Sequence, residues 1–151
     1  MMRGALTGKV AIVTAAGRRR SIGNSAARAL ARMGADLVLT GTGRDPDTFP
    51  EDEKKAGWRD VESTAAQVRQ LGRRALTTTL DVRNVDLIDR MVSRTLEEFG
   101  RIDILINNAA LPIGADRVSM VDVDPELFER VISVKVMGSF LCSRAVAKVL
   151  I

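Results

Sequence analysis

Short apolar runs alternate with longer amphipathic stretches along most of this chain. Val10–Val13 is a continuous apolar run of strand length, and residues 36–40, 75–80 and 102–106 are similar runs. Apolar residues at helical spacing fall at 26–33, 61–71 and 85–99, and again from Pro125 onward, where one long helix is predicted up to Ile151. Such alternation is typical of right-handed βαβ units, which build a parallel sheet. The pattern therefore predicts an α/β fold with a doubly wound parallel sheet, truncated after about four strands.

Residues 44–60 interrupt the alternation with polar and helix-breaking residues. Pro46, Pro50, an acidic run at 51–53 and the lone Trp58 fall within it. Connections in compact domains are usually only a few residues long. We predict a long surface loop here, which is either functional or a tolerated insertion.

The size and composition of the chain limit its architecture. Residues 1–151 contain 46% hydrophobic residues and are expected to form one domain. No apolar run approaches the ~20 residues of a membrane span, and the N-terminus lacks the apolar segment of a signal peptide. The single cysteine, Cys142, lies among apolar residues, so we expect a buried hydrophobic side chain in a reducing compartment. We therefore predict a cytoplasmic protein without a membrane partner.

Charge and missing residue types narrow the chemistry. The net charge is +4, but the arginines are dispersed except at 18–20 and 73–74, and only 3% of the residues are aromatic. A nucleic-acid surface needs a basic patch or a stacking platform, so no nucleic-acid partner is predicted. The sequence has no histidine and no tyrosine, which removes the commonest general base and the phenolic acid. No metal site is predicted.

The most informative stretch is the turn between the first strand and the first helix. Its small residues allow backbone N–H groups to approach a pyrophosphate, and the positive end of the helix dipole favours that negative charge. Its three arginines add direct charge. Ala15 and Ser21 stand where glycines are expected, so an ordinary connection is the alternative. The cofactor-binding residues predicted here are Thr14, Ala16, Gly17, Arg18, Arg19, Arg20, Ser21, Ile22 and Gly23.

Two further motifs follow later strands. Asp81-Val82 comes after the third, and Asn107-Asn108-Ala109-Ala110 comes after the fourth. With the turn, these motifs resemble the short-chain dehydrogenase/reductase (SDR) family over nearly the whole chain. The resemblance implies a Rossmann-like fold that binds NAD(P) at the carboxyl ends of its strands. It also implies that Asp81 and Val82 contact the adenine ring, that Asn107 braces the sheet, and that Asn108, Ala109 and Ala110 adjoin the cofactor. Taken singly, Asp81 is a turn former and the two asparagines are a polar strand exit.

The end of the second strand bears on the choice of cofactor. NAD-preferring sites place a carboxylate there for the ribose hydroxyls, whereas this chain reads Thr40-Gly41-Thr42-Gly43-Arg44. Arg44 and one of the arginines at 18–20 are predicted to pair with a 2′-phosphate. We therefore predict NADP(H) over NAD(H). The alternative is that these arginines only coat a solvated surface.

Catalysis is less complete in this sequence. In the SDR family, as the resemblance implies, hydride transfer uses a serine, a tyrosine and a lysine four residues after it, all beyond a fifth strand. This sequence has no tyrosine, so no catalytic residue is assigned. Lys135 stands where the resemblance places an asparagine of the proton relay, and a helix-surface lysine is the alternative. The chain as written is expected to bind the cofactor without turnover.

The resemblance implies an NAD(P)(H)-dependent oxidoreductase acting on a carbonyl or hydroxyl group. The turn is similar to that of enoyl-acyl-carrier reductases, whereas the later motifs are similar to the main branch, which includes 3-oxoacyl-acyl-carrier reductases. A small carbonyl substrate is expected only if a longer form exists. The rival interpretation is a non-catalytic nucleotide-binding or interaction module.

The predicted strand order also bears on assembly. An order of 3-2-1-4 places the apolar strand at 102–106 on an edge of the sheet. The last predicted helix carries more apolar surface than one packing face requires. We therefore predict self-association.

Overall fold

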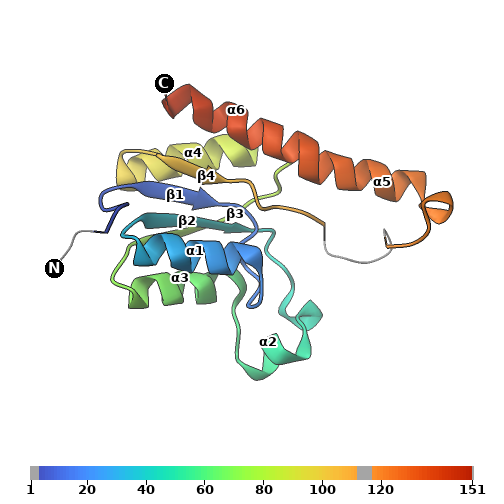
Figure 1. Cartoon of the computed structure of the whole chain (residues 1–151), viewed down its shortest axis with the longest axis horizontal. Helices are drawn as coiled ribbons and strands as arrows, with labels where there is room; N and C mark the ends of the chain where they lie inside the picture. Colours follow the sequence, from blue (N-terminus) through green and yellow to red (C-terminus); the bar gives the residue numbers. More distant parts are fainter. Residues whose placement is uncertain (1–3, 112–116, 151) are drawn as a thin grey trace.

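The protein is built around a parallel β-sheet with helices on both sides (Figure 1). The computed structural model describes residues 4–111 and 117–150. Its strands are β1 (Val10–Val13), β2 (Asp36–Gly41), β3 (Ala75–Thr79) and β4 (Ile104–Ile106). They lie in the order β3-β2-β1-β4, and every neighbouring pair is parallel. This order confirms the sheet that the sequence predicts.

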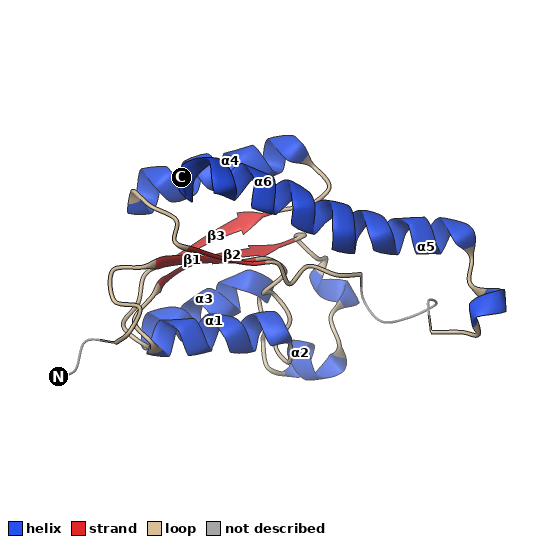
Figure 2. Ribbon diagram, turned by 45° about the horizontal axis from the view of Figure 1, so that its top comes forward, coloured by secondary structure: helices blue, strands red, loops and turns tan. Residues whose placement is uncertain are grey.

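Helices cover the two faces of the sheet in pairs (Figure 2). One layer holds α1 (Ile22–Arg32) and α3 (Asp60–Gln70), and the other holds α4 (Val85–Phe99) and α6 (Gly138–Leu150). The helix α5 (Pro125–Ile132) continues into α6 through a π-helical segment, Ser133–Met137. None of the helices in the described ranges combines the length and the hydrophobicity that crossing a membrane requires.

Capping side chains fix where the helices begin. The Ser21 hydroxyl accepts a hydrogen bond from the Asn24 amide at 3.1 Å, and the Asn84 side chain accepts one from the Leu87 amide at 3.1 Å. These contacts satisfy amide groups that an α-helix leaves without partners in its first turn. Helix α4 ends at Gly100, whose φ of 74° is left-handed and suits glycine. The start of α1, next to the turn after β1, is therefore fixed by a neighbouring side chain.

Strand β1 supplies both halves of the core. Val10 and Ile12 pack toward α4 and α6, whereas Ala11 and Val13 pack toward α1 and α3. Because side chains alternate across a strand, a strand buried on both faces reads as one apolar run. Cys142 is buried in the first of these clusters, as predicted, and burial raises the pKa of its thiol to about 11.

Three sequence predictions need correction. The fourth strand is shorter than predicted, and its residues are half-buried rather than fully buried, because β4 lies at an edge of the sheet. Residues 44–60 are not a plain loop, since they form a 3₁₀ turn (Pro46–Thr48) and a short helix α2 (Glu51–Lys55). The long last helix contains the π segment, and its predicted end at Ile151 lies outside the described residues.

Candidate functional site

A cleft of about 510 Å³ opens at the carboxyl ends of the strands. In doubly wound sheets this edge is where ligands bind. The segment 44–60, with α2, lies on the same side of the molecule (Figure 1). Many of the residues predicted from sequence line the cleft: Gly17, Arg18, Ser21, Ile22, Arg44, Asp81, Val82, Asn108, Ala109, Ala110 and Lys135.

Side-chain donors hold the turn between β1 and α1 by hydrogen bonds to its carbonyl oxygens. The Asn108 amide group donates to the carbonyls of Thr14 and Ala15 at 3.0 and 3.1 Å. Three other donors hold the next three carbonyls in turn, at 2.7, 2.7 and 2.8 Å: the Thr64 hydroxyl to Ala16, the Trp58 indole N–H to Gly17 and the Ser21 hydroxyl to Arg18. Five consecutive carbonyl oxygens of the turn thus accept hydrogen bonds from side chains of the protein, which fixes the shape of the backbone in front of α1.

The first turn of α1 supplies free N–H groups. Within the described part of the chain, the amides of Ile22 and Gly23 have no hydrogen-bond acceptor. A Cβ on Gly23 would come within 2.7 Å of the Ala15 carbonyl oxygen, so only glycine allows this close approach of helix and turn. Ile22 is 79% exposed at the mouth of the cleft. The helix end can therefore receive a phosphate group.

Ala15 occupies the place of the first expected glycine, and its backbone adopts a conformation that glycine would adopt more easily. Its φ of 55° lies in the left-handed region, which costs an L-residue about 1–2 kcal/mol. Surrounding hydrogen bonds hold it there: its amide donates to the Thr40 hydroxyl at 3.3 Å, and its carbonyl accepts from Asn108. The degenerate motif thus keeps the backbone shape of a glycine turn.

The roles predicted for Asn107 and Asn108 are distributed differently in the structure. The Asn108 side chain ties the loop after β4 to the end of β1, and Thr14 completes this tie by accepting from the amides of Asn108 and Ala109 at 2.9 and 3.0 Å. Asn107 instead donates to the Ser143 hydroxyl on α6 at 2.9 Å. Asn108 is therefore the residue that braces the sheet, because its side chain faces β1, while Asn107 joins β4 to a helix.

Asp81 and Val82 form the wall of the cleft after β3. Two nitrogens of Arg83 bind the Asp81 carboxylate, the closer at 2.6 Å, and they hold the pKa of Asp81 below its usual value although burial raises it. The Val82 side chain is buried and packs against Gly138 at the start of α6. Asp81 therefore stays ionised at the cleft, as an adenine acceptor requires.

Arg44 does not stand free at the end of β2. Its guanidinium donates to Glu53 at 3.1 Å and to Asp60 at 2.8 Å, and it lies over the Phe49 ring at 4.4 Å. Although burial lowers it, the pKa of Arg44 is raised by these two carboxylates. The sequence-based argument that no acid lies at this position is therefore wrong in three dimensions, because the segment after β2 folds back and brings two acids to it.

The three arginines of the turn separate into two groups. The Arg19 amide donates to Glu53 at 2.7 Å and its guanidinium to the Asp52 carbonyl at 3.2 Å, while Arg20 lies 3.6 Å from the Asp52 carboxylate. Arg18 is exposed and lines the cleft. Arg18 is thus the arginine of this group that adds charge to the cleft, and the other two fasten residues 52 and 53 to the turn.

Several site residues escaped the sequence analysis. Glu53 is 3% exposed, and its two oxygens bind the turn and Arg44. Trp58 and Asp60 also contact the turn from the same segment. The lone tryptophan and the acidic run at 51–53 were visible as unusual features of this segment, but sequence alone did not say that they fold onto the turn.

Lys135 lies in the π-helical segment and lines the cleft. Its side chain is exposed, and its carbonyl accepts from the Ser139 hydroxyl at 2.6 Å. A π-helical turn inside an α-helix is uncommon and often occurs at functional sites. The lysine therefore reaches the cleft rather than only coating the helix surface.

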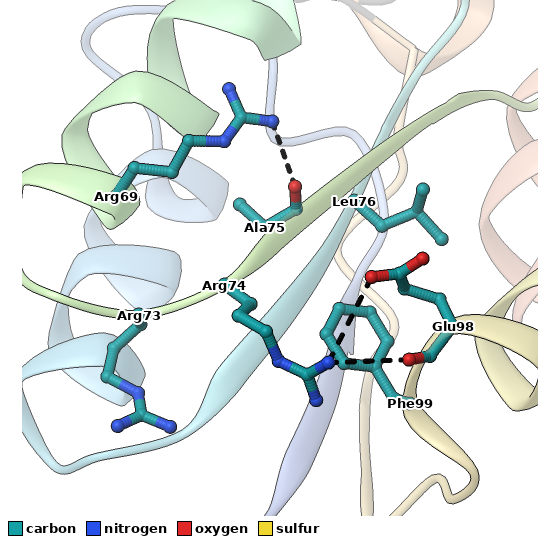
Figure 3. Close-up of a pocket in the computed structure, with 7 residues that line it drawn as sticks. All are labelled: Arg69, Arg73, Arg74, Ala75, Leu76, Glu98 and Phe99. Carbon is teal, nitrogen blue, oxygen red and sulfur yellow. Dashed lines mark hydrogen bonds and ion pairs between the residues drawn. The ribbon is translucent and has the colours of Figure 1, made fainter.

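A second hollow, of about 450 Å³, lies at the other end of the sheet, where β3 begins (Figure 3). Three arginines line it, but acids compensate them. Asp36 pairs with Arg73 at 2.8 Å and with Arg74 at 3.1 Å, and Glu62 lies 3.7 Å from Arg69. Glu98, which also lines the hollow, lies 4.0 Å from Arg74, so three acids face the three arginines. Arg74 also lies over the Phe99 ring at 4.5 Å (Figure 3). This hollow therefore offers no uncompensated charge for an anionic ligand.

The residues of the main cleft fit a dinucleotide. The turn presents N–H groups and Arg18 to a pyrophosphate, and Asp81 lies after β3, where the resemblance places the adenine ring. Among the described residues, no group of three or more histidine, cysteine, aspartate or glutamate side chains is placed to hold a metal ion.

Comparison with known proteins decides the family. The sequence profile of the family described as short chain dehydrogenase matches residues 9–151. The chain belongs to the short-chain dehydrogenase family. This short-chain dehydrogenase chain is 32% identical over 147 residues to a 3-oxoacyl-[acyl-carrier-protein] reductase of Synechocystis, covering 97% of this chain and 52% of that protein. It is 35% identical to a 2-dehydro-3-deoxy-D-gluconate 5-dehydrogenase of Escherichia coli, covering 95% and 48% of the two chains.

Solved structures agree with this assignment. A carveol dehydrogenase from Mycobacterium avium in complex with NAD matches the short-chain dehydrogenase chain with a TM-score of 0.80 and 26% identity. The match covers 97% of this chain and 51% of that one. The chain thus spans about half the length of the relatives it matches.

Proposed function

We propose that this chain is the cofactor-binding part of an NAD(P)(H)-dependent oxidoreductase, folded as one dinucleotide-binding domain over residues 1–151. The observation that carries the proposal is the turn before α1, in which side chains hold the carbonyls of residues 14–18 by hydrogen bonds. The amides of Ile22 and Gly23 are left for a pyrophosphate. Family membership supplies the chemistry: hydride transfer between a nicotinamide and a carbonyl or hydroxyl carbon.

The chain by itself is proposed to bind without turnover. The resemblance to the SDR family places the catalytic tyrosine and lysine beyond a fifth strand, and this sequence has no tyrosine. Relatives about twice as long bear the names of reductases and dehydrogenases, which supports a small carbonyl substrate for a longer form. The cytoplasm, where nicotinamide cofactors are abundant, is the proposed location.

A binding titration tests this proposal. Trp58 is the only tryptophan, and its indole donates to the Gly17 carbonyl, so its fluorescence reports on the turn. We expect saturable quenching by a reduced dinucleotide and no oxidation of that dinucleotide when a carbonyl compound is added. In Gly23→Ala the new methyl group meets the Ala15 carbonyl, so binding should be lost. A folded wild-type chain that shows no saturation at millimolar dinucleotide would refute the proposal.

The choice between the two dinucleotides needs a separate argument. The sequence predicts NADP(H), with Arg44 and an arginine at 18–20 as partners of the 2′-phosphate. In the structure Arg44 pairs with two carboxylates, which a 2′-phosphate would have to displace. Of the arginines predicted to bind a 2′-phosphate, Arg18 lines the cleft and pairs with no carboxylate among the described residues, so the NADP(H) preference predicted from sequence depends on Arg18 alone.

A second candidate function, an interaction module, draws on the surface of α5 and α6. Four apolar side chains there are more than half exposed: Phe128, Val136, Met137 and Phe140. We propose that this surface pairs with a second copy of the chain, because exposed apolar area of this kind is typical of an interface. Sedimentation at micromolar concentration should show a dimer or larger species that Phe140→Glu dissociates. A monomer throughout would exclude it.

A further inference from the structure

Asp60 reaches the end of β2 from the start of α3. A Cβ placed on Gly41, the last residue of β2, would come within 3.1 Å of the Asp60 Oδ2. The nearest atom to that Cβ is Val61 Cγ1, at 2.9 Å, so the side chains of Val61 and Asp60 together fill the space that a side chain at position 41 would occupy. The carboxyl end of β2 has no acid of its own, and Asp60 brings one there from farther along the chain.

The backbone of Asp60 is shaped for this placement. Its φ of 49° is left-handed, a conformation that aspartate and asparagine tolerate better than most residues. Its carboxylate also lies against Gly17, where any Cβ would overlap it. Asp60 thus lies between the phosphate-binding turn and the end of β2, which is where a doubly wound fold binds the adenosine ribose.

One carboxylate oxygen of Asp60 is held and the other is available. Oδ1 accepts from Arg44 Nε at 3.1 Å and from Nη2 at 2.8 Å. Oδ2 accepts no hydrogen bond from any residue that the structure describes, and Asp60 lines the cleft. A fixed carboxylate with one open oxygen is suited to accept hydrogen bonds from ribose hydroxyls.

The charges around Arg44 disfavour a phosphate at this point. Glu53 and Asp60 both pair with Arg44, so the three groups together carry one net negative charge. The Glu53 side chain is 4% exposed and also accepts from the Arg19 amide, so it cannot swing away without breaking the turn. A 2′-phosphate would bring about two further negative charges to this cluster.

Arg18 does not reverse this balance. It lines the cleft in the turn just before α1, and its carbonyl accepts a hydrogen bond from the hydroxyl of Ser21, the N-cap of that helix, at 2.8 Å. Both dinucleotides carry the pyrophosphate that this end of the helix favours. Attraction at that group therefore adds to the affinity of both and does not distinguish them.

We propose that Asp60 is the specificity-determining residue of this site: its carboxylate binds the adenosine ribose hydroxyls in place of an acid at the carboxyl end of β2, and the cleft selects NAD(H) over NADP(H). This rests on the proposed dinucleotide-binding function and reverses the preference predicted from sequence. The residue was hidden from sequence analysis because it follows Gly41 by a whole inserted segment.

The test is a pair of dissociation constants, for NADH and NADPH, measured by calorimetry on the wild-type chain and on Asp60→Asn. Asparagine keeps the left-handed backbone and an acceptor for Arg44 but removes the charge. We expect the wild-type chain to bind NADH about tenfold or more tightly than NADPH, and Asp60→Asn to lose about tenfold of that ratio. Asp60→Gly, which suits the same φ without strain, provides a second variant with the carboxylate removed altogether.

A matched control is Glu51→Gln, which removes one negative charge from the same segment at an exposed site outside the cleft. It should leave the ratio unchanged. Equal or tighter NADPH binding by the wild-type chain would overturn the inference, and so would a ratio that both Asp60 variants preserve. If a folded wild-type chain binds neither dinucleotide, the proposed function itself fails, which is a different result from binding without preference.

Discussion

The two walls of the cleft are built in different ways. The wall formed by the turn, β2 and residues 44–60 is held by polar groups that are buried, as in Glu53, or half-buried, as in Trp58 and Asp60. The wall formed by α5, the π segment and α6 exposes large apolar side chains. The first wall satisfies its own hydrogen bonds, whereas the second leaves surface for another partner. We therefore expect a single substitution to lower the free energy of unfolding much more in the polar wall than in the apolar wall.

The largest expected effect is at Glu53. Glu53→Ala removes the acceptor of the Arg19 amide and one partner of Arg44 inside the protein, and we expect the free energy of unfolding to fall by about 3 kcal/mol. Phe140→Ala is the matched truncation on the apolar wall, where the residue is 56% exposed, and in the single chain, below the concentration at which copies pair, it should cost about 0.5 kcal/mol or less. Urea denaturation measures both. Equal losses would abolish the contrast between the walls.

The next effect concerns Asp103, just before β4, at the end of the sheet opposite the cleft. Arg101, the Val10 amide and Lys9 lower the pKa of Asp103 to about 2, against the effect of burial. A pKa lower in the folded than in the unfolded state stabilises the fold above about pH 4, and this stabilisation disappears as the pH falls toward the folded pKa.

Asp103→Asn should therefore lower stability by about 1–2 kcal/mol at neutral pH, a figure reduced for the exposure of Arg101 and Lys9. The difference from the wild-type chain should vanish near pH 2. Thermal unfolding across this pH range measures it. A difference that stays constant with pH would assign the effect to packing rather than to charge.

A smaller effect is expected at Trp58. Trp58→Phe keeps an aromatic ring but removes the N–H that donates to the Gly17 carbonyl, so about 1 kcal/mol of stability should be lost. Calorimetry should also show weaker dinucleotide binding, because the turn is less firmly held. Unchanged affinity together with unchanged stability would show that the indole bond contributes nothing to the polar wall.

The smallest effect is a gain. Ala15→Gly relieves the left-handed backbone of the turn at a cost in the entropy of the unfolded chain, and we expect a net stabilisation of about 0.5 kcal/mol. Ala16→Gly is the control: it has the same entropy cost and no strain to relieve, so it should destabilise. If both variants destabilise the chain equally, the strain at Ala15 is not significant.

The sequence predicted the strand order and most of the residues that line the cleft. These features follow from local patterns, namely apolar runs and motifs at strand ends. It did not predict the roles of Asp60 and Glu53. Each of these residues contacts a turn residue that is 34 or more positions away in sequence, and the contact forms only because the segment 44–60 folds back onto the turn. It also assigned the bracing role to Asn107 instead of Asn108, since adjacent side chains leave a strand end in different directions. Local sequence patterns could thus be interpreted directly, whereas charge pairs between distant segments could not be predicted.

The indole of Trp58 has a consequence for time as well as for stability. Its N–H donates a hydrogen bond to the carbonyl of Gly17, in the turn that lines the cleft. Any ligand that holds Gly17 in place therefore also holds the segment that carries Trp58, and by reciprocity a loosening of that segment weakens the ligand's hold. Hydrogen exchange at the amides of residues 44–60 should therefore slow when a ligand is bound at the turn.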